Sequence, residues 1–196
     1  MKKNKVILYD IFRIGVFTMK KNKVILYIIY FFTAAGLIAF DQFSKILAIN
    51  HLKDKNPIVI IKNVFELLYV ENKGAAYGML AGKISLFLII TFILVPLLIF
   101  SIHKISTIIE EFGDKVNVIA FKILQIDMVV IVAGAIGNFI DRVTKGYVID
   151  YFYFKLIDFP VFNVADCYIT VAVIVFLIIC FFVLKDNELD YLMSSK

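Results

Sequence analysis

Two stretches of this chain contain no charged residue over almost the full width of a lipid bilayer. They are residues 84–102 (ISLFLIITFILVPLLIFSI) and residues 167–184 (CYITVAVIVFLIICFFVL). A helix needs about 20 apolar residues to cross the hydrocarbon core, because each residue adds only about 1.5 Å along the helix axis. Both stretches are therefore predicted to be membrane-spanning helices, and Pro96 in the first is tolerated in such a helix.

The overall composition agrees with a membrane protein. Hydrophobic residues make up 62% of the 196 residues, charged residues make up 19%, and the mean hydropathy is +0.91. A soluble domain of this size would leave too much of that apolar surface in water. Two less uniform spans are predicted at 24–48 and 120–142. The second contains the small residues Gly134 and Gly137, which favour close helix packing, and Asp127, which is expected to be solvated or paired.

The predicted fold class is an all-α membrane protein of four transmembrane helices with a small β element. The extracytoplasmic segment 49–83 contains two apolar runs, 57–61 and 64–70, bounded by Asn, Lys and Gly. These runs predict a strand pair that rests on the outer membrane surface. The segment 141–166 is rich in Tyr and Phe, so it is predicted to be an interfacial loop at the level of the lipid headgroups.

Lysine and arginine cluster at the start of the chain, where seven of the 21 lie in the first 23 positions. Basic residues that flank the first helix usually stay on the cytoplasmic side. Both termini are therefore predicted to be cytoplasmic. The formal net charge of +5 is explained by membrane orientation, and no nucleic-acid partner is expected.

The nonapeptide MKKNKVILY occurs twice, at residues 1–9 and 19–27, and both copies begin with Met. We interpret residues 1–18 as a duplicated start or an N-terminal extension, and residues 19–196 as a single membrane domain. The alternative is that the extra segment is amphipathic and lies on the inner leaflet.

The cysteines and histidines are not placed for a disulfide or a metal site. Cys167 and Cys180 are thirteen residues apart on one predicted helix, a separation of about 20 Å that no disulfide can bridge. His51 and His103 fall on opposite sides of the membrane, which also disfavours serine–histidine catalysis. We expect no metal and no other cofactor.

The polar residues beside the apolar stretches are the informative ones, because burying them is costly. They form four groups, and the four-span topology places all four at the outer membrane boundary. Spacings of three and four residues put the members of a helical group on one face. This convergence predicts a functional site. The groups are Asp41 with Lys45, Asn72 with Gly74, Asn138 with Asp141 and Arg142, and Asp150 with Asn163 and Asp166.

Two carboxylates near an apolar boundary can share one proton, because like charges a few ångströms apart do not both ionise cheaply. One carboxylate then activates water as a general base, while the protonated one polarises a peptide carbonyl. Asp150 and Asp166 have no basic residue within four positions, so they are the candidate pair. The alternative is purely structural, since Asp166 is also well placed to cap the fourth helix.

The other two aspartates have basic neighbours. Asp41 lies four residues before Lys45, and Asp141 is adjacent to Arg142. Both aspartates are therefore expected to form structural ion pairs.

These residues lie in five motifs whose order resembles that of the bacterial lipoprotein signal peptidases, also called signal peptidase II. The resemblance covers about residues 19–184, and Tyr77 stands where that family more often has Phe. Each motif is weak alone, and five in the right order are specific. The motifs are DQFSK (41–45), NKGAAYG (72–78), GAIGNFIDR (134–142), GYVIDY (146–151) and FNVAD (162–166).

The resemblance implies a membrane aspartic endopeptidase with Asp150 and Asp166 as its catalytic pair. The implied substrate is a prolipoprotein with diacylglycerol on its lipobox cysteine, cut on the N-terminal side of that cysteine. The implied place is the bacterial cytoplasmic (inner) membrane, with the site at its outer face, and we expect a monomer in membrane lipid. The residues implied to line or support the site are Asp41, Lys45, Asn72, Gly74, Asn138, Asp141, Arg142 and Asn163.

Two other functions remain open on the residues alone. A small ion- or proton-coupled transporter is one, because acids inside a membrane often mark ion pathways. Here, however, the acids gather at one boundary, and the second and fourth spans offer no charged relay. A membrane scaffold whose polar residues only cap helices is the other.

Overall fold

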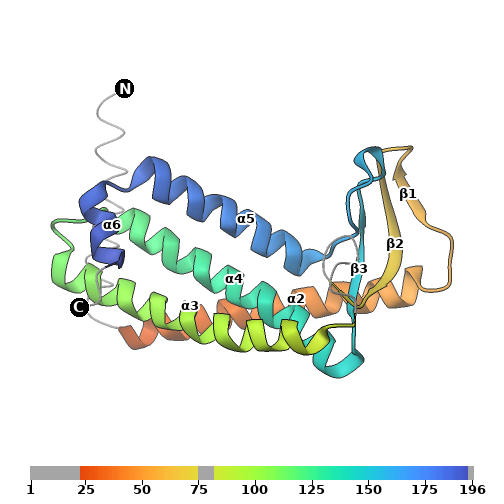
Figure 1. Cartoon of the computed structure of the whole chain (residues 1–196), viewed down its shortest axis with the longest axis horizontal. Coiled ribbons are helices and arrows are strands. Elements are labelled where there is room, and N and C mark those ends of the chain that lie inside the picture. The colour runs from red at the N-terminus through yellow and green to blue at the C-terminus, as the bar shows by residue number, and fades with distance from the viewer. Residues whose placement is uncertain (1–22, 75–81, 194–196) are drawn as a thin grey trace.

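The computed structural model describes residues 23–74 and 82–193. Four long helices form a bundle, and a small β-sheet covers one end of it (Figure 1). The duplicated segment 1–18 and the second half of the NKGAAYG motif, with Tyr77, lie outside the described residues. The helices are α2 (Lys23–Leu52), α3 (Ile84–Phe112), α4 (Val118–Lys145), α5 (Val164–Ile178), which continues as a π-helical turn η3 (Ile179–Val183), and α6 (Asp186–Met193).

The four predicted spans are confirmed as helices long and apolar enough to cross a membrane. Their outer surfaces carry large apolar side chains, and Phe92 and Phe182 are 76% and 83% exposed. Exposure on this scale would be costly in water, whereas lipid tails are as apolar as these side chains. The four helices therefore belong in a bilayer.

Helix α4 lies in the middle of the bundle. In its most apolar stretch 61% of the residues are buried inside the protein, against 6% in α2, 0% in α3 and 11% in the span formed by α5 and η3. A helix that other helices shield from lipid does not need a continuous apolar surface. This position explains why α4 tolerates several polar residues.

Glycines allow the close packing that the small residues of α4 predicted. A Cβ atom added at Gly134 would lie 2.7 Å from the backbone oxygen of Ala165 on α5. A Cβ added at Gly137 would lie 2.5 Å from Oδ2 of Asp41 on α2. Only a residue without a side chain lets both neighbouring helices approach α4 so closely.

The sheet contains β1 (Ile58–Ile61), β2 (Phe65–Asn72) and β3 (Val148–Tyr153), all antiparallel, in the order β1-β2-β3. The predicted strand pair is therefore confirmed. The prediction of an interfacial loop over 141–166 is wrong for β3, which joins the sheet beside β2. The first four residues of β3 are all buried, so the strand lacks the alternation of apolar and polar residues that usually reveals one.

All four spans extend beyond the predicted boundaries at one end at least. Helix α2 continues to Leu52, α3 to Phe112 and α4 to Lys145. Helix α5 begins at Val164, before Asp166, because Asn163 caps it. Hydropathy marks the part of a helix that lies in lipid, whereas capping and tertiary contacts determine where the helix ends.

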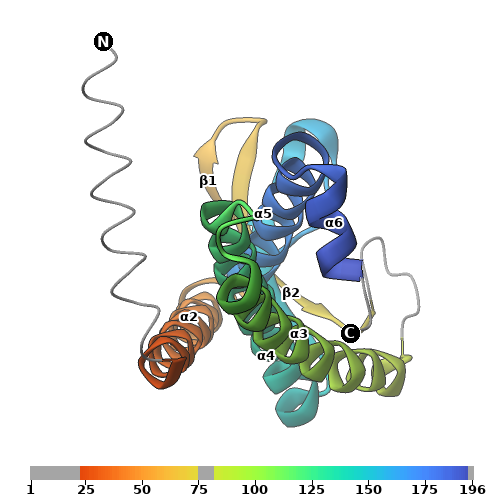
Figure 2. The same ribbon diagram turned by 90° about the vertical axis from the view of Figure 1, so that its left-hand side faces the viewer.

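The two ends of the described chain lie at the end of the bundle away from the sheet (Figures 1 and 2). Nζ of Lys23, the first residue of α2, is 2.8 Å from a carboxylate oxygen of Glu110 on α3. The C-terminal α6 packs on α3, with 4.5 Å between the ring centroids of Tyr191 and Phe112. Glu188 of α6 also accepts a hydrogen bond from the backbone N–H of Asn117. Both ends of the described chain lie at the same end of the bundle because the number of spans is even.

Asp127 of α4 differs from the prediction. It is only 6% exposed, and its Oδ2 atom has no hydrogen-bond partner in the described part of the chain. The expectation of a solvated or paired residue is therefore wrong for this oxygen, because the neighbouring helices cover α4 at this level.

Candidate active site

The polar residues predicted from the sequence converge at the sheet end of the bundle. Asp150 comes from the middle of β3, and Asp166 comes from the first turn of α5. The residues between them fold back so that Phe162 pairs with Phe152 in an isolated β-bridge. This return of the chain brings the start of α5 next to β3, and with it the two carboxylates.

Asp150 is buried and held by two asparagines. Its Oδ2 accepts a hydrogen bond of 2.8 Å from Nδ2 of Asn72 on β2, and its Oδ1 accepts one of 2.6 Å from Nδ2 of Asn163. The side chain is 2% exposed. Burial, followed by the negative charge of Asp166, raises the pKa of Asp150 from 3.8 to about 7. Asp150 can therefore hold a proton at neutral pH.

Asp166 is held by the cap of its own helix and by α4. Its Oδ2 accepts a hydrogen bond of 3.1 Å from the backbone N–H of Asn163, whose side chain accepts one of 3.0 Å from the backbone N–H of Asp166. This reciprocal pair is a capping box. The other oxygen, Oδ1, accepts a bond of 2.8 Å from Nδ2 of Asn138. Asn163 therefore binds both carboxylates at once.

A buried cluster of charges lies beside the pair. Nζ of Lys45 is 1% exposed and lies 2.9 Å from Oδ2 of Asp41 and 2.9 Å from Oδ2 of Asp141. It also donates a hydrogen bond of 2.8 Å to Oδ1 of Asn138. Because Asn138 binds Asp166 through its other amide atom, the cluster fixes the orientation of that amide.

The predicted ion pair of Asp41 with Lys45 is confirmed, and the prediction for Asp141 names the wrong partner. Asp141 pairs with Lys45 and, at 2.6 Å, with Lys145 one helical turn further along α4. Arg142 is adjacent in sequence, but adjacent residues of a helix point about 100° apart. Positions four apart share a face, and that spacing selects Lys145.

Arg142 instead reaches across to the segment that follows β2. Its Nη2 donates a hydrogen bond of 3.3 Å to the backbone oxygen of Gly74, and its guanidinium lies 4.6 Å from the ring centroid of Phe87 on α3. The backbone N–H of Gly74 in turn donates a bond of 2.9 Å to Oδ1 of Asn72. Arg142 and Gly74 thus orient the amide that binds Asp150.

Two residues of this region, Ser44 and Tyr151, lie within two of the five motifs, but the sequence gives no sign that they contact each other. The hydroxyl of Tyr151 on β3 donates a hydrogen bond of 2.6 Å to Oγ of Ser44 on α2. A hydroxyl pair between distant residues has no characteristic spacing. The prediction of β3 as a loop also concealed the direction of Tyr151, because strand geometry alone places its side chain opposite that of Asp150.

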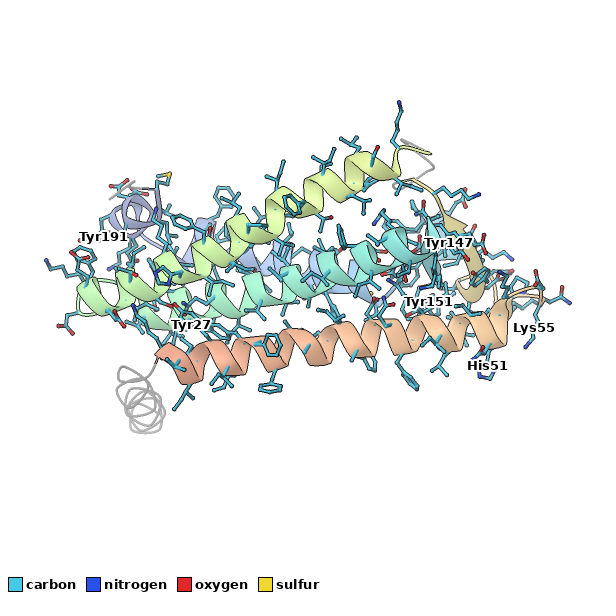
Figure 3. All side chains as sticks on the ribbon, turned by 90° about the horizontal axis from the view of Figure 1, so that it is seen from below. Tyr27, His51, Lys55, Tyr147, Tyr151 and Tyr191 are labelled. Atoms are coloured by element: carbon cyan, nitrogen blue, oxygen red, sulfur yellow. The ribbon has the colours of Figure 1, made fainter. Side chains whose placement is uncertain are left out.

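His103 and Cys180 lie away from this site, whereas Cys167 directly follows Asp166 on α5. His103 shares a hydrogen bond of 3.0 Å with Tyr27, which lies at the opposite end of α2 from His51 (Figure 3). Both cysteines are free thiols. Within residues 23–74 and 82–193, no group of three His, Cys, Asp or Glu side chains is arranged to hold a metal ion.

Comparison with known proteins agrees with this geometry. The sequence profile of the family described as "Signal peptidase (SPase) II" matches residues 33–182. A protein of Clostridioides difficile named lipoprotein signal peptidase is 38% identical over 148 residues, which cover 76% of this chain and 89% of the relative. Another, from Caldanaerobacter subterraneus, is 41% identical over 142 residues, which cover 72% and 88%.

The fold has a solved counterpart as well. A bacterial membrane enzyme whose structure was determined by the in meso method superposes with a TM-score of 0.63 and 29% sequence identity. The superposition covers 85% of this chain and 92% of the other. The chain therefore belongs to the signal peptidase II family of lipoprotein signal peptidases, which are aspartic peptidases of the membrane.

Proposed function

We propose that this chain removes signal peptides from diacylglyceryl-modified prolipoproteins by cutting on the N-terminal side of the lipidated cysteine, with Asp150 and Asp166 activating water. The observation that carries the proposal is the bridge made by Asn163. Its side-chain amide binds Asp150 at 2.6 Å while its backbone N–H binds Asp166 at 3.1 Å. One residue thus holds the buried Asp150 and the half-buried Asp166 side by side.

The distribution of charge supports a reactive role for these two aspartates over a structural one. Lys45 and Lys145 are engaged by Asp41 and Asp141. In the described part of the chain no ion pair includes Asp150 or Asp166. A buried carboxylate without a cation is costly unless it can share a proton.

The roles of the two carboxylates follow from their surroundings. Asp150, which lies outside the helix terminus that favours charge on Asp166, keeps the shared proton and donates a hydrogen bond to the scissile carbonyl oxygen. Asp166 lies in the first turn of α5, where the helix dipole favours negative charge, and takes a proton from the attacking water.

Bond formation between the water oxygen and the carbonyl carbon gives a tetrahedral intermediate. The proton on Asp166 then passes to the leaving nitrogen, the C–N bond breaks, and Asp150 regains its original state. No cofactor takes part in this sequence.

The substrate and the membrane side are further parts of the proposal. The carboxylates lie at one end of helices whose surfaces are apolar, so acyl chains on the substrate cysteine can remain in lipid while the peptide reaches the site. The basic residues that precede α2 favour a cytoplasmic N-terminus, which places the sheet and the site at the outer face of the inner membrane. Residues 19–196 then form the peptidase domain, and residues 1–18 are a dispensable extension.

The test uses the purified full chain in detergent with a synthetic prolipoprotein peptide that carries diacylglyceryl cysteine. The matched substrate is the same peptide with unmodified cysteine. We expect one cut, before the cysteine, in the lipidated peptide alone, and mass spectrometry of both products locates it. A folded chain that cuts neither peptide, or cuts elsewhere, refutes the proposal. Ion flux through vesicles that contain such an inactive chain would favour the transporter instead.

A further inference from the structure

Tyr151 follows Asp150 on β3, and its side chain leaves the strand on the opposite face. The ring packs with Ile149, Ala48 and Leu52 and is 5% exposed. Figure 3 shows Tyr151 at the sheet end of α2. The residue thus packs β3 against α2 from the side that Asp150 does not use.

The hydroxyl of Tyr151 takes part in a directed chain of hydrogen bonds. Oγ of Ser44 donates its single hydrogen to the backbone oxygen of Asp41 at 2.6 Å, so Ser44 can only accept from Tyr151, also at 2.6 Å. Burial raises the pKa of Tyr151 to about 12, and the phenol therefore remains a neutral donor at every working pH.

Tyr151 also lies against the start of α5, because Val164 packs on the same apolar cluster. Val164 lies between Asn163, which binds both carboxylates, and Asp166. The next backbone N–H, that of Ala165, donates a bond of 3.0 Å to Oδ1 of Asp41. Tyr151 thus lies against both α2 and the turn of α5 that carries Asp166.

We propose that Tyr151 is a positioning residue, which fixes β3 relative to α2 and the first turn of α5 and thereby sets the placement of Asp150 against Asp166. The inference rests on the proposed roles of these two aspartates. Without the phenol hydroxyl, β3 keeps its pairing with β2 but loses this hydrogen bond to α2. The carboxylates then sample separations in which they share a proton less well.

The test compares Tyr151→Phe and Ser44→Ala, which remove the same hydrogen bond from opposite sides, with the double variant. Tyr153→Phe is the matched control, because its hydroxyl lies on the same strand and, among the described residues, binds only the exposed Asp158, at 2.7 Å. Each single variant should lower kcat about tenfold with KM unchanged, since small errors in placement act on the chemical step. The double variant should resemble the single ones, and Ser44→Thr, which keeps a hydroxyl, should retain activity.

A shift of the pH profile of kcat in Tyr151→Phe distinguishes positioning from mere stabilisation, which would lower only the unfolding temperature. This inference is overturned if Tyr151→Phe and Ser44→Ala both keep the kcat and the pH profile of wild type while Asp150→Asn is inactive. The proposed function would remain intact in that case. Activity in Asp150→Asn would instead refute the proposed function. If one single variant does not fold, the other carries the test.

Discussion

Replacement of Lys45 by Met removes the cation that Asp41 and Asp141 share. The side chain of Lys45 is 1% exposed and both carboxylates are fully buried, so water cannot take its place. Removal of one partner from a buried ion pair costs about 3–5 kcal/mol, because the remaining charge stays uncompensated. The free energy of unfolding should fall by that amount, which corresponds to a drop in the unfolding temperature on the order of 10 °C.

The two carboxylates are not equally dependent on Lys45. Asp141 keeps Lys145 at 2.6 Å and the backbone N–H of Ile149 at 3.3 Å. Asp41 has no second cation in the described part of the chain. Asp41→Asn should therefore restore more of the stability lost in Lys45→Met than Asp141→Asn does.

The assay is thermal unfolding of the purified variants in one detergent, followed by tyrosine fluorescence or circular dichroism. Lys53→Met is the matched control, since Lys53 pairs with Glu71 at 3.1 Å at the surface, where such pairs often contribute nothing measurable. A Lys45→Met variant as stable as this control would refute the buried charge cluster. If Asp141→Asn restored more of the stability lost in Lys45→Met than Asp41→Asn does, the conclusion that Asp41 depends more on Lys45 would be refuted.

Three further predictions concern the site and its packing. Because the pKa of Asp150 rises from 3.8 to about 7 on folding, the folded chain binds a proton that the unfolded chain loses, and wild-type stability falls from about pH 4 to about pH 7. Asp150→Asn should therefore unfold at a higher temperature than wild type at pH 8 but not at pH 4. An equal difference in unfolding temperature between variant and wild type at the two pH values would contradict the raised pKa of Asp150. In Gly137→Ala the new Cβ would lie 2.5 Å from Oδ2 of Asp41, so the free energy of unfolding should fall by about 1–3 kcal/mol. In the control Gly36→Ala the new Cβ would have nothing within 4 Å, so the free energy of unfolding should stay unchanged or rise. Chemical denaturation measures both. Asn163→Ser keeps the helix cap but loses the buried amide that donates to Asp150 and Asn138, so both the unfolding temperature and peptide cleavage should drop. Full activity in the folded variant would show that the bridge is dispensable.

The apolar spans and the strand pair could be predicted because each depends on local sequence. A run of about 20 uncharged residues has few structures open to it, and for that reason residues 84–102 are helical as predicted, within α3. The short apolar run 57–61, bounded by polar residues, contains β1. The third strand could not be predicted in this way. Residues 148–151 are buried on both faces by α2 and by the chain that returns through Phe162, and such covering is a property of the tertiary structure.

For the candidate site, the residues could be predicted from the sequence but their contacts across helices could not. Its residues could be found because polar side chains beside apolar runs are rare, and their order could be compared with a known family. Their partners could not be found, since contacts between helices depend on packing. Asp141 of α4 binds Lys45 of α2, and Ser44 meets Tyr151 across 107 positions of sequence. Gly137 had a packing signal, but its contact with Asp41 required the structure.

The most direct test of the central claim is cleavage of the diacylglyceryl prolipoprotein peptide by wild type, Asp150→Asn and Asp166→Asn, with Asp158→Asn as the control outside the site and EDTA present throughout. The account predicts cleavage by wild type and the control, and no cleavage by either site variant when both are folded by circular dichroism. Cleavage by a folded Asp150→Asn or Asp166→Asn at the wild-type rate would contradict it.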